Sequence, residues 1–254
     1  MAEQGYVKSH AEHGITTIEF FHPKSNSLPA KLLEELSHEI HYAGTHDTKV
    51  IILKSAGTGA FCAGASFDEL MSIQNEKEGH DFFQGFGNVI NAMRKCKKLI
   101  IGRIHGKSVG GGVGLAAACD YAIACKHSEI KLSELALGIG PFVVGPAIKR
   151  KIGPSAFSQL AIDATLWRNA DWAKKKGLFA EVHETVQNLD ESVRRLANSL
   201  AHSNPEAMEE MKNVFWEGTD SWDSLLHERA AISGRLILSQ FTKNALSKLR
   251  TGSK

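Results

Sequence analysis

Two glycine-containing turns each follow a predicted strand and precede a predicted helix. The first spans residues 61–67 (FCAGASF) and the second spans residues 110–115 (GGGVGL). Backbone N–H groups at the start of a helix have no partner inside the helix, so each turn can present free donors to an anion. Three successive glycines in the second turn also remove the side chains that would keep a ligand away from the backbone. Short glycine turns also occur simply as tight strand–helix connections, and this interpretation stays open.

The pattern around the glycines favours an oxyanion over a phosphate as the anion. A phosphate-binding P-loop would continue with a lysine followed by serine or threonine, and these residues are missing here. The run GGVGL also does not fit the GxGxxG pattern of dinucleotide-binding folds. We therefore expect the two turns to converge on a negatively charged oxygen.

Glu134 is the candidate proton-transfer group. It follows a predicted strand at 130–133 and precedes a segment of apolar residues and glycines at 135–142. A carboxylate in such surroundings loses solvation, which raises its pKa and lets it accept and donate protons near neutral pH. A solvated carboxylate at a strand end is the alternative interpretation of the same local sequence.

The elements that would position these residues alternate between strand and helix. Strand-like runs rich in β-branched residues occur at 15–21, 50–54, 99–104, 121–124, 130–133 and 179–182. Apolar residues three and four apart predict helices at 29–43, 82–95 and 113–119, and then at 189–201, 205–216 and 222–238. The pattern predicts an α/β fold with a mostly parallel sheet in residues 1–190 and a helical C-terminal subdomain in residues 191–254.

Composition excludes several classes of function. The 254 residues include 30 basic and 28 acidic residues mixed along the chain, without the basic block that nucleic-acid binding requires. The four cysteines show no CxxC spacing, and the histidines show no ligand spacing, so we expect reduced thiols and no metal site. Residues 1–5 do not resemble a signal peptide, and no apolar stretch approaches the ~20 residues of a membrane span. We expect a cytoplasmic protein with neither a nucleic-acid nor a membrane partner.

Five segments, taken in order and spacing, resemble the crotonase superfamily, also called the enoyl-CoA hydratase/isomerase family. They are 22–28 (HPKSNSL), 60–65 (AFCAGA), 105–112 (HGKSVGGG), 118–120 (ACD) and 133–139 (SELALGI). The resemblance implies a crotonase-like spiral of ββα units followed by a helical C-terminal region. It also implies an acyl-CoA substrate, no cofactor other than the coenzyme A of that substrate, and a homotrimer or a hexamer made of two trimers.

The resemblance assigns roles to particular residues. The two backbone N–H groups that hold the thioester enolate map to Ala65 and Gly111. Family hydratases use two glutamates, which map here to Gly114 and Glu134, so the first carboxylate is missing. Residues expected to contact the substrate are Lys24, Ala63, Ser66, Phe67, Gly110, Gly114 and Phe142.

A single glutamate can move a double bond from the 3,4 to the 2,3 position of an enoyl-CoA, because it can remove a proton from C2 and return it at C4. The segment 137–142 also resembles the Δ3,Δ2-enoyl-CoA isomerases of the family. The first hypothesis is therefore an isomerase or a combined hydratase/isomerase. The second is a true hydratase, also of branched or carboxylated enoyl-CoA, in which Asp68, Glu69 or a carboxylate of the substrate supplies the missing acid. The third is an acyl-CoA-binding relative that has lost catalysis.

Overall fold

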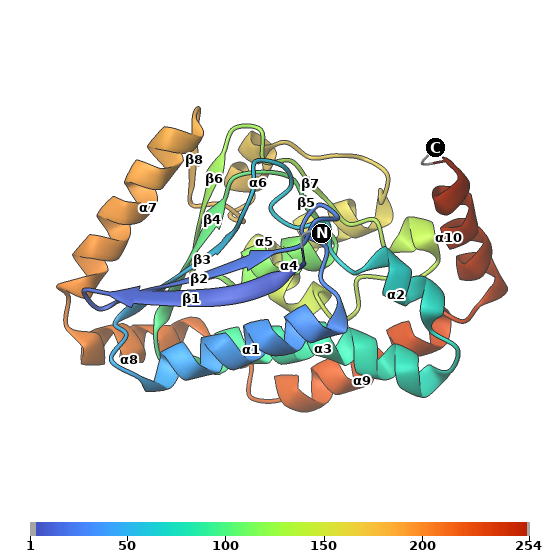
Figure 1. The fold of residues 1–254 in the computed structure, drawn as a ribbon, viewed down its shortest axis with the longest axis horizontal. Coiled ribbons are helices and arrows are strands. Elements are labelled where there is room, and N and C mark those ends of the chain that lie inside the picture. The colour runs from blue at the N-terminus through green and yellow to red at the C-terminus, as the bar shows by residue number, and fades with distance from the viewer. Residues whose placement is uncertain (1–3, 253–254) are drawn as a thin grey trace.

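The computed structural model describes residues 4–252 and contains a six-stranded sheet covered by helices on both faces (Figure 1). Along the sheet the strands are β1 (Tyr6–Glu12), β2 (Ile15–Phe21), β3 (Val50–Ser55), β4 (Leu99–Ile104), β6 (Tyr121–Cys125) and β8 (Glu181–His183). The β1–β2 hairpin is antiparallel and every later pair is parallel. The α/β class and the mostly parallel sheet are thus confirmed. Residues 1–3 and 253–254 lie outside the described residues, and with them most of the segment used to judge a signal peptide.

Side chains of the central strands point alternately to two helical layers, as the two-residue period of a strand requires. On β3, Ile51 and Leu53 belong to the larger apolar core, whereas Val50 packs in a second core with Leu189 and Val193. The larger core lies under α1 (Ala30–Thr45), α3 (Glu76–Lys95) and α4 (Gly111–Ala118). Burial on both faces explains why most residues in these central strands are apolar, without alternating polar positions.

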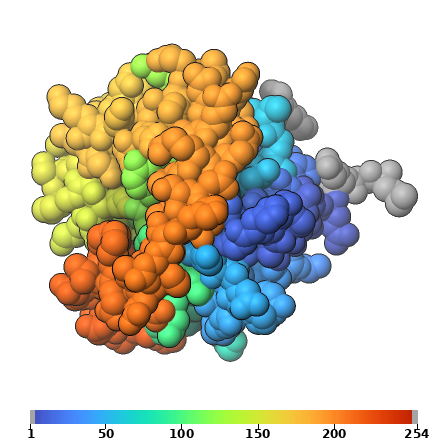
Figure 2. Space-filling model, turned by 90° about the vertical axis from the view of Figure 1, so that its left-hand side faces the viewer, coloured from blue at the N-terminus to red at the C-terminus, as the bar shows by residue number. Residues whose placement is uncertain are grey.

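Helix α7 (Val186–Ala201) covers the second face of the sheet and contacts five of its strands. Viewed from that side, α7 lies across the centre of the surface in light orange, beside the blue β1–β2 hairpin (Figure 2). Helices α8 (Pro205–Phe215) and α9 (Trp222–Leu236) follow, and α9 packs along α3. The three expected C-terminal helices are present, and the division of the chain at residue 190 stays a prediction.

A buried ion pair ties α8 to the sheet. The Asp120 carboxylate accepts hydrogen bonds from Lys212 Nζ at 2.9 Å, from the Ile100 backbone N–H at 2.7 Å and from Trp216 Nε1 at 2.9 Å. The Lys212 and Asp120 side chains are only 2% and 5% exposed. Because Asp120 follows α4 directly, this network fixes the C-terminal end of that helix to α8.

Several elements were not expected from the sequence, among them β1, α5 (Gly145–Ile162), α6 (Ala170–Lys175) and α10 (Gln240–Gly252). Helix α5 contains Pro154 and a kink at Gly153, where φ is +76°, and it begins with Gly145 and Pro146. Glycine and proline break the apolar period on which helix prediction depends, so the sequence hid this helix.

A separate two-stranded sheet carries the candidate site. Strand β5 (Ser108–Val109) pairs in parallel with β7 (Ile130–Lys131). A strand was predicted at 130–133, but β7 ends at Lys131, two residues earlier. The chain then forms a short 3-10 helix, η1 (Leu135–Leu137). This pairing brings the residues after β5 next to those after β7.

Candidate active site

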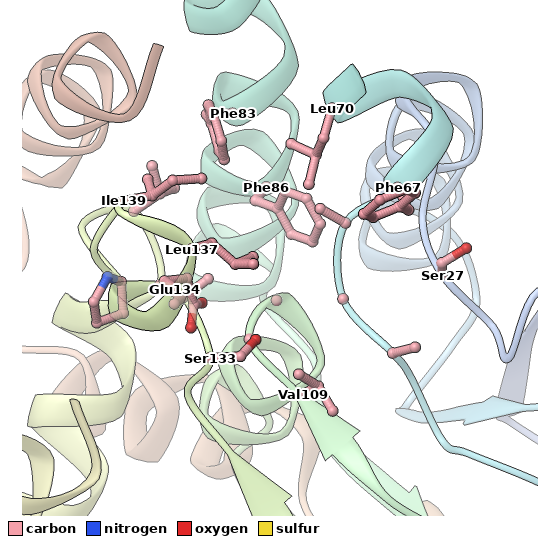
Figure 3. A pocket seen from close by; sticks show the side chains of 18 of the residues that line it. Ser27, Phe67, Leu70, Phe83, Phe86, Val109, Ser133, Glu134, Leu137 and Ile139 are labelled. Atoms are coloured by element: carbon pink, nitrogen blue, oxygen red, sulfur yellow. The ribbon is translucent and has the colours of Figure 1, made fainter. Parts of the chain in front are cut away.

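A cavity of about 390 Å³ lies between the two glycine turns, helices α2 (Phe67–Ser72) and α3, and the η1 segment (Figure 3). Most of its wall is apolar. Phe67 and Leu70 come from α2, Phe83 and Phe86 from α3, and Ile139 from the chain after η1. Among the described residues of the wall, Glu134 supplies the only carboxylate and Lys24 the only ammonium group.

Backbone hydrogen bonds hold the two turns side by side. Val109 N–H donates to the Cys62 carbonyl at 2.9 Å, and Cys62 N–H donates to the Lys107 carbonyl at 3.2 Å. A β-carbon placed at Gly64, where φ is +85°, would lie only 2.8 Å from the Val109 oxygen and 3.3 Å from the Gly111 nitrogen. Glycine is required there, because any side chain would push the turns apart.

The N–H groups of Ala65 and Gly111 are free donors at this junction. Within residues 4–252 neither has a hydrogen-bond acceptor, whereas the preceding Gly110 N–H donates to the Lys131 carbonyl at 2.9 Å. Gly111 is the first residue of α4, and all eight residues of that helix are buried. Two fixed donors beside an apolar cavity form the arrangement that stabilises an oxyanion.

The Glu134 carboxylate lies directly over the start of α4. The Glu134 carbonyl accepts a hydrogen bond from Ile139 N–H at 2.9 Å, which closes the turn after β7. A β-carbon at Gly110 would lie 2.9 Å from Glu134 Oε1. Gly110 also has a φ of +52°, so both the backbone conformation and the available space require glycine at this position.

The carboxylate of Glu134 is desolvated. Its Oε2 atom is buried and has no hydrogen-bond partner within the described part of the chain. Burial raises the pKa of Glu134 from 4.5 to about 7. A carboxyl group with this pKa can both accept and donate a proton near neutral pH.

Gly114 has no room for a side chain. A β-carbon there would lie 2.6 Å from Val144 Cγ1 and 2.7 Å from Val144 Cβ. Val144 itself is buried and lines the cavity. An apolar side chain thus fills the space into which a carboxylate at position 114 would project.

The structure brings most of the expected site residues to one cavity. Its wall includes Lys24, Ala63, Ala65, Phe67, Gly110, Gly111, Glu134 and Phe142. Two expected substrate contacts, Ser66 and Gly114, do not line the cavity. The Ser66 side chain instead caps α2 by accepting the Glu69 N–H at 3.4 Å.

The two acids considered as substitutes for the missing carboxylate are engaged elsewhere. Asp68 forms an ion pair with Lys24, and both side chains are more than 60% exposed. Glu69 Oε2 accepts the Ala30 N–H at 2.7 Å at the start of α1. Neither residue lines the cavity.

Several apolar residues of the wall were not identified from the sequence. Phe83 and Phe86 lie three apart on a predicted helix, but the period alone does not tell which core the helix faces. The Phe86 ring packs on Gly111, where a β-carbon would come within 2.2 Å of the ring atom Cε1. This contact fixes one wall of the cavity against the oxyanion turn.

Within residues 4–252, no helix combines the length and the apolar content needed to cross a membrane. No group of three or more His, Cys, Asp or Glu side chains is arranged to hold a metal ion in the same range.

Comparison with known proteins places this geometry in a family. The model of the family described as enoyl-CoA hydratase/isomerase matches residues 10–247. The mitochondrial methylglutaconyl-CoA hydratase of Mus musculus is 32% identical over 201 residues, which are 77% of this chain and 63% of that protein. The peroxisomal Delta(3,5)-Delta(2,4)-dienoyl-CoA isomerase of Arabidopsis thaliana is 30% identical over 183 residues, 66% of this chain and 64% of the relative. The chain thus spans less than two-thirds of the length of either relative.

A solved structure shows the same fold. The crystal structure of an enoyl-CoA hydratase from Bacillus halodurans superposes with a TM-score of 0.88 and 21% identity, covering 96% of this chain and 99% of that one. This likeness confirms the crotonase-like α/β fold class. The chain therefore belongs to the enoyl-CoA hydratase/isomerase family of the crotonase superfamily.

Proposed function

We propose that this chain is a Δ3,Δ2-enoyl-CoA isomerase in which Glu134 alone transfers the proton. The observation that carries the proposal is the contrast between two positions on the cavity wall. Glu134 presents a desolvated carboxylate with a pKa near 7, whereas Val144 fills the space beside Gly114. The site thus has one acid–base group, which is enough to move a double bond but leaves hydration without a second group.

The reaction is a proton transfer within one substrate. The Glu134 carboxylate removes a proton from C2 of the 3-enoyl thioester, and the electron pair spreads over the carbonyl oxygen and C4. The protonated carboxyl group then returns the same proton to C4, which leaves the double bond between C2 and C3. No water or cofactor is consumed, and Glu134 ends in its starting state.

The two backbone donors stabilise the intermediate. The thioester oxygen gains negative charge when C2 loses its proton, and the N–H groups of Ala65 and Gly111 would bind that oxygen. A preorganised donor of this kind contributes about 3 kcal/mol in a dry site. The apolar wall formed by Phe67, Phe83 and Phe86 supports this, because it excludes the water that would screen the charge.

Lys24 would mark the coenzyme A end of the cavity. It lines the wall on the side of Ser25 and Ser27, and its ammonium group is the only one among the described wall residues. A phosphate would share this group with the exposed Asp68, its ion-pair partner. Ala63 and Gly110 would contact the thioester and Phe142 the acyl chain. A homotrimer or a pair of trimers stays part of the proposal, and light scattering on the purified protein tests it.

A combined hydratase/isomerase is the second candidate. It is supported by the name of the methylglutaconyl-CoA hydratase relative. Asp68 and Glu69 are poor substitutes for the missing acid because both are bound elsewhere, so a hydratase would need a carboxylate from the substrate. The retained Glu134 and the two free donors argue against a chain that only binds acyl-CoA.

One side-by-side assay separates these candidates. The purified protein is given a 3-enoyl-CoA and a 2-enoyl-CoA, and formation of the 2-enoyl and 3-hydroxyacyl products is followed. We expect faster consumption of the 3-enoyl substrate, with loss of at least about a hundredfold in Glu134→Gln. The control is Glu210→Gln, which removes an exposed carboxylate on α8. Efficient hydration, or an active Glu134→Gln variant, would overturn the proposal.

A further inference from the structure

A second hollow of about 660 Å³ adjoins the candidate active site. It lies between α5 and α9, and it shares Pro141 and Phe142 with the catalytic cavity. The rest of its wall includes the apolar side chains of Phe157 and Ala161 from α5 and Leu225 from α9. Charged residues also border it, namely Lys149, Arg150, Glu217 and Arg229. The short stretch from Pro141 to Phe142 is thus a thin partition between two open spaces.

The Phe142 side chain is half-buried in this partition. Its backbone N–H donates to the Gly140 carbonyl at 2.7 Å, and the ring leans over Gly140, where a β-carbon would come within 2.6 Å. No aromatic ring of the described residues stacks on Phe142. A core aromatic side chain is packed closely on all sides, whereas this ring lines both spaces, so its displacement would join one space to the other.

The proposed orientation of the bound substrate brings its acyl chain to this partition. Ser27 and Ile139 lie on opposite sides of the catalytic cavity, and Glu134 lies nearer to Ile139 (Figure 3). With coenzyme A at the Lys24 end and the thioester between Ala65 and Gly111, the acyl chain must run past Glu134. It then meets the segment that contains Phe142.

We propose that Phe142 sets the acyl-chain length of this site, and that a long chain displaces its ring and continues into the hollow between α5 and α9. This inference rests on the proposed acyl-CoA function and names its substrate class as enoyl-CoA with a long unbranched chain. Each methylene that packs against the apolar side chains of the hollow increases affinity roughly fourfold, because it is removed from water. The gain ends where the chain fills the hollow.

The experiment compares a series of 3-enoyl-CoA substrates from six to fourteen carbons in kcat/KM. The main variant is Ala161→Trp, which fills the hollow from α5 without touching the catalytic wall. Leu225→Trp fills it from α9 and serves if the first variant does not fold. Ala207→Trp, on an exposed position of α8, adds the same ring away from both spaces. Binding of saturated acyl-CoA, measured by calorimetry, gives the same comparison without turnover.

We expect the native protein and Ala207→Trp to gain roughly tenfold or more from the shortest to the longest chain. Ala161→Trp should lose that gain and keep its rate on the six-carbon substrate, whereas Phe142→Ala should shift preference toward longer chains. Equal chain-length profiles in the native protein and both filled variants would overturn the role of the hollow. Absence of turnover at every length, with acyl-CoA binding that still rises with length, would overturn the isomerase function alone.

Discussion

Replacing Glu134 with glutamine should stabilise the fold above neutral pH while it abolishes proton transfer. Burial raises the pKa of this carboxyl group from 4.5 to about 7. A pKa difference of one corresponds to about 1.4 kcal/mol, so the folded protein pays about 3 kcal/mol to hold the ionised form. Glutamine has no charge and avoids that cost. Its buried amide lacks hydrogen-bond partners, however, which lowers the expected gain in stability by about 1 kcal/mol.

The pH window follows from the sign of the shift. Below about pH 4.5 the group is protonated in both the folded and the unfolded chain, and it has no effect on stability. Between about pH 4.5 and pH 7 the unfolded chain ionises first, so the free energy of unfolding falls as pH rises. Above pH 7 the full penalty is present. We therefore expect Glu134→Gln to be more stable than the native protein by about 1–3 kcal/mol at pH 8, and by much less at pH 5.

Urea unfolding of the two proteins at pH 5 and pH 8 measures this difference, because the other titrating groups cancel in the comparison. Glu210→Gln provides the control, since its carboxylate is exposed. In parallel, kcat/KM of the native protein for a 3-enoyl-CoA should rise with pH and level off above about pH 7. A stability difference that is the same at both pH values would refute the desolvation of Glu134.

Three further substitutions test the surroundings of the site. Gly114→Ala should destabilise the protein by about 1–3 kcal/mol in urea unfolding, because its β-carbon overlaps Val144, and adding Val144→Ala should relieve part of that loss; a neutral Gly114→Ala would contradict the crowding. Lys212→Met should cost about 3–5 kcal/mol of unfolding free energy by leaving Asp120 buried and unpaired, and a smaller loss would mean that water reaches the carboxylate. Gly110→Ala should lower kcat about a hundredfold, with a smaller effect on KM, because its β-carbon would displace the Glu134 carboxylate that we propose as the proton-transfer group. Unchanged kinetics would contradict this position of the carboxylate.

The sequence was sufficient for strands β3, β4 and β6 of the central sheet, because they are buried on both faces and therefore combine apolar character with short length. The strand at 99–104 was predicted with the bounds that β4 has. Local sequence predicted an element less well where tertiary contacts determine whether the element forms. Strand β5 is two residues long and exists because β7 pairs with it, so no pattern of its own reveals it.

The glycines and Glu134 could be identified as candidates because their residue types are informative in themselves. The depth of burial of the carboxylate could not be predicted, since part of the cavity wall, such as Phe83 and Phe86, comes from a distant segment of the chain. The sequence also showed that position 114 lacks a side chain, but it could not show which residue fills the space beside it. That Val144 occupies the vacated space is a contact between two helices thirty residues apart in the chain.

Different stretches of the chain form the two ends of the cavity. The turn before α2 and the start of α4 supply the N–H donors, whereas the acyl chain would meet residues 139–144, which follow the left-handed Gly138. Because these stretches are separate in the chain, substitutions between Ile139 and Val143 can change the acyl end without changing a residue of the two glycine turns. A lineage with this architecture can inherit its chemistry intact while it exchanges one short segment to reach new substrates.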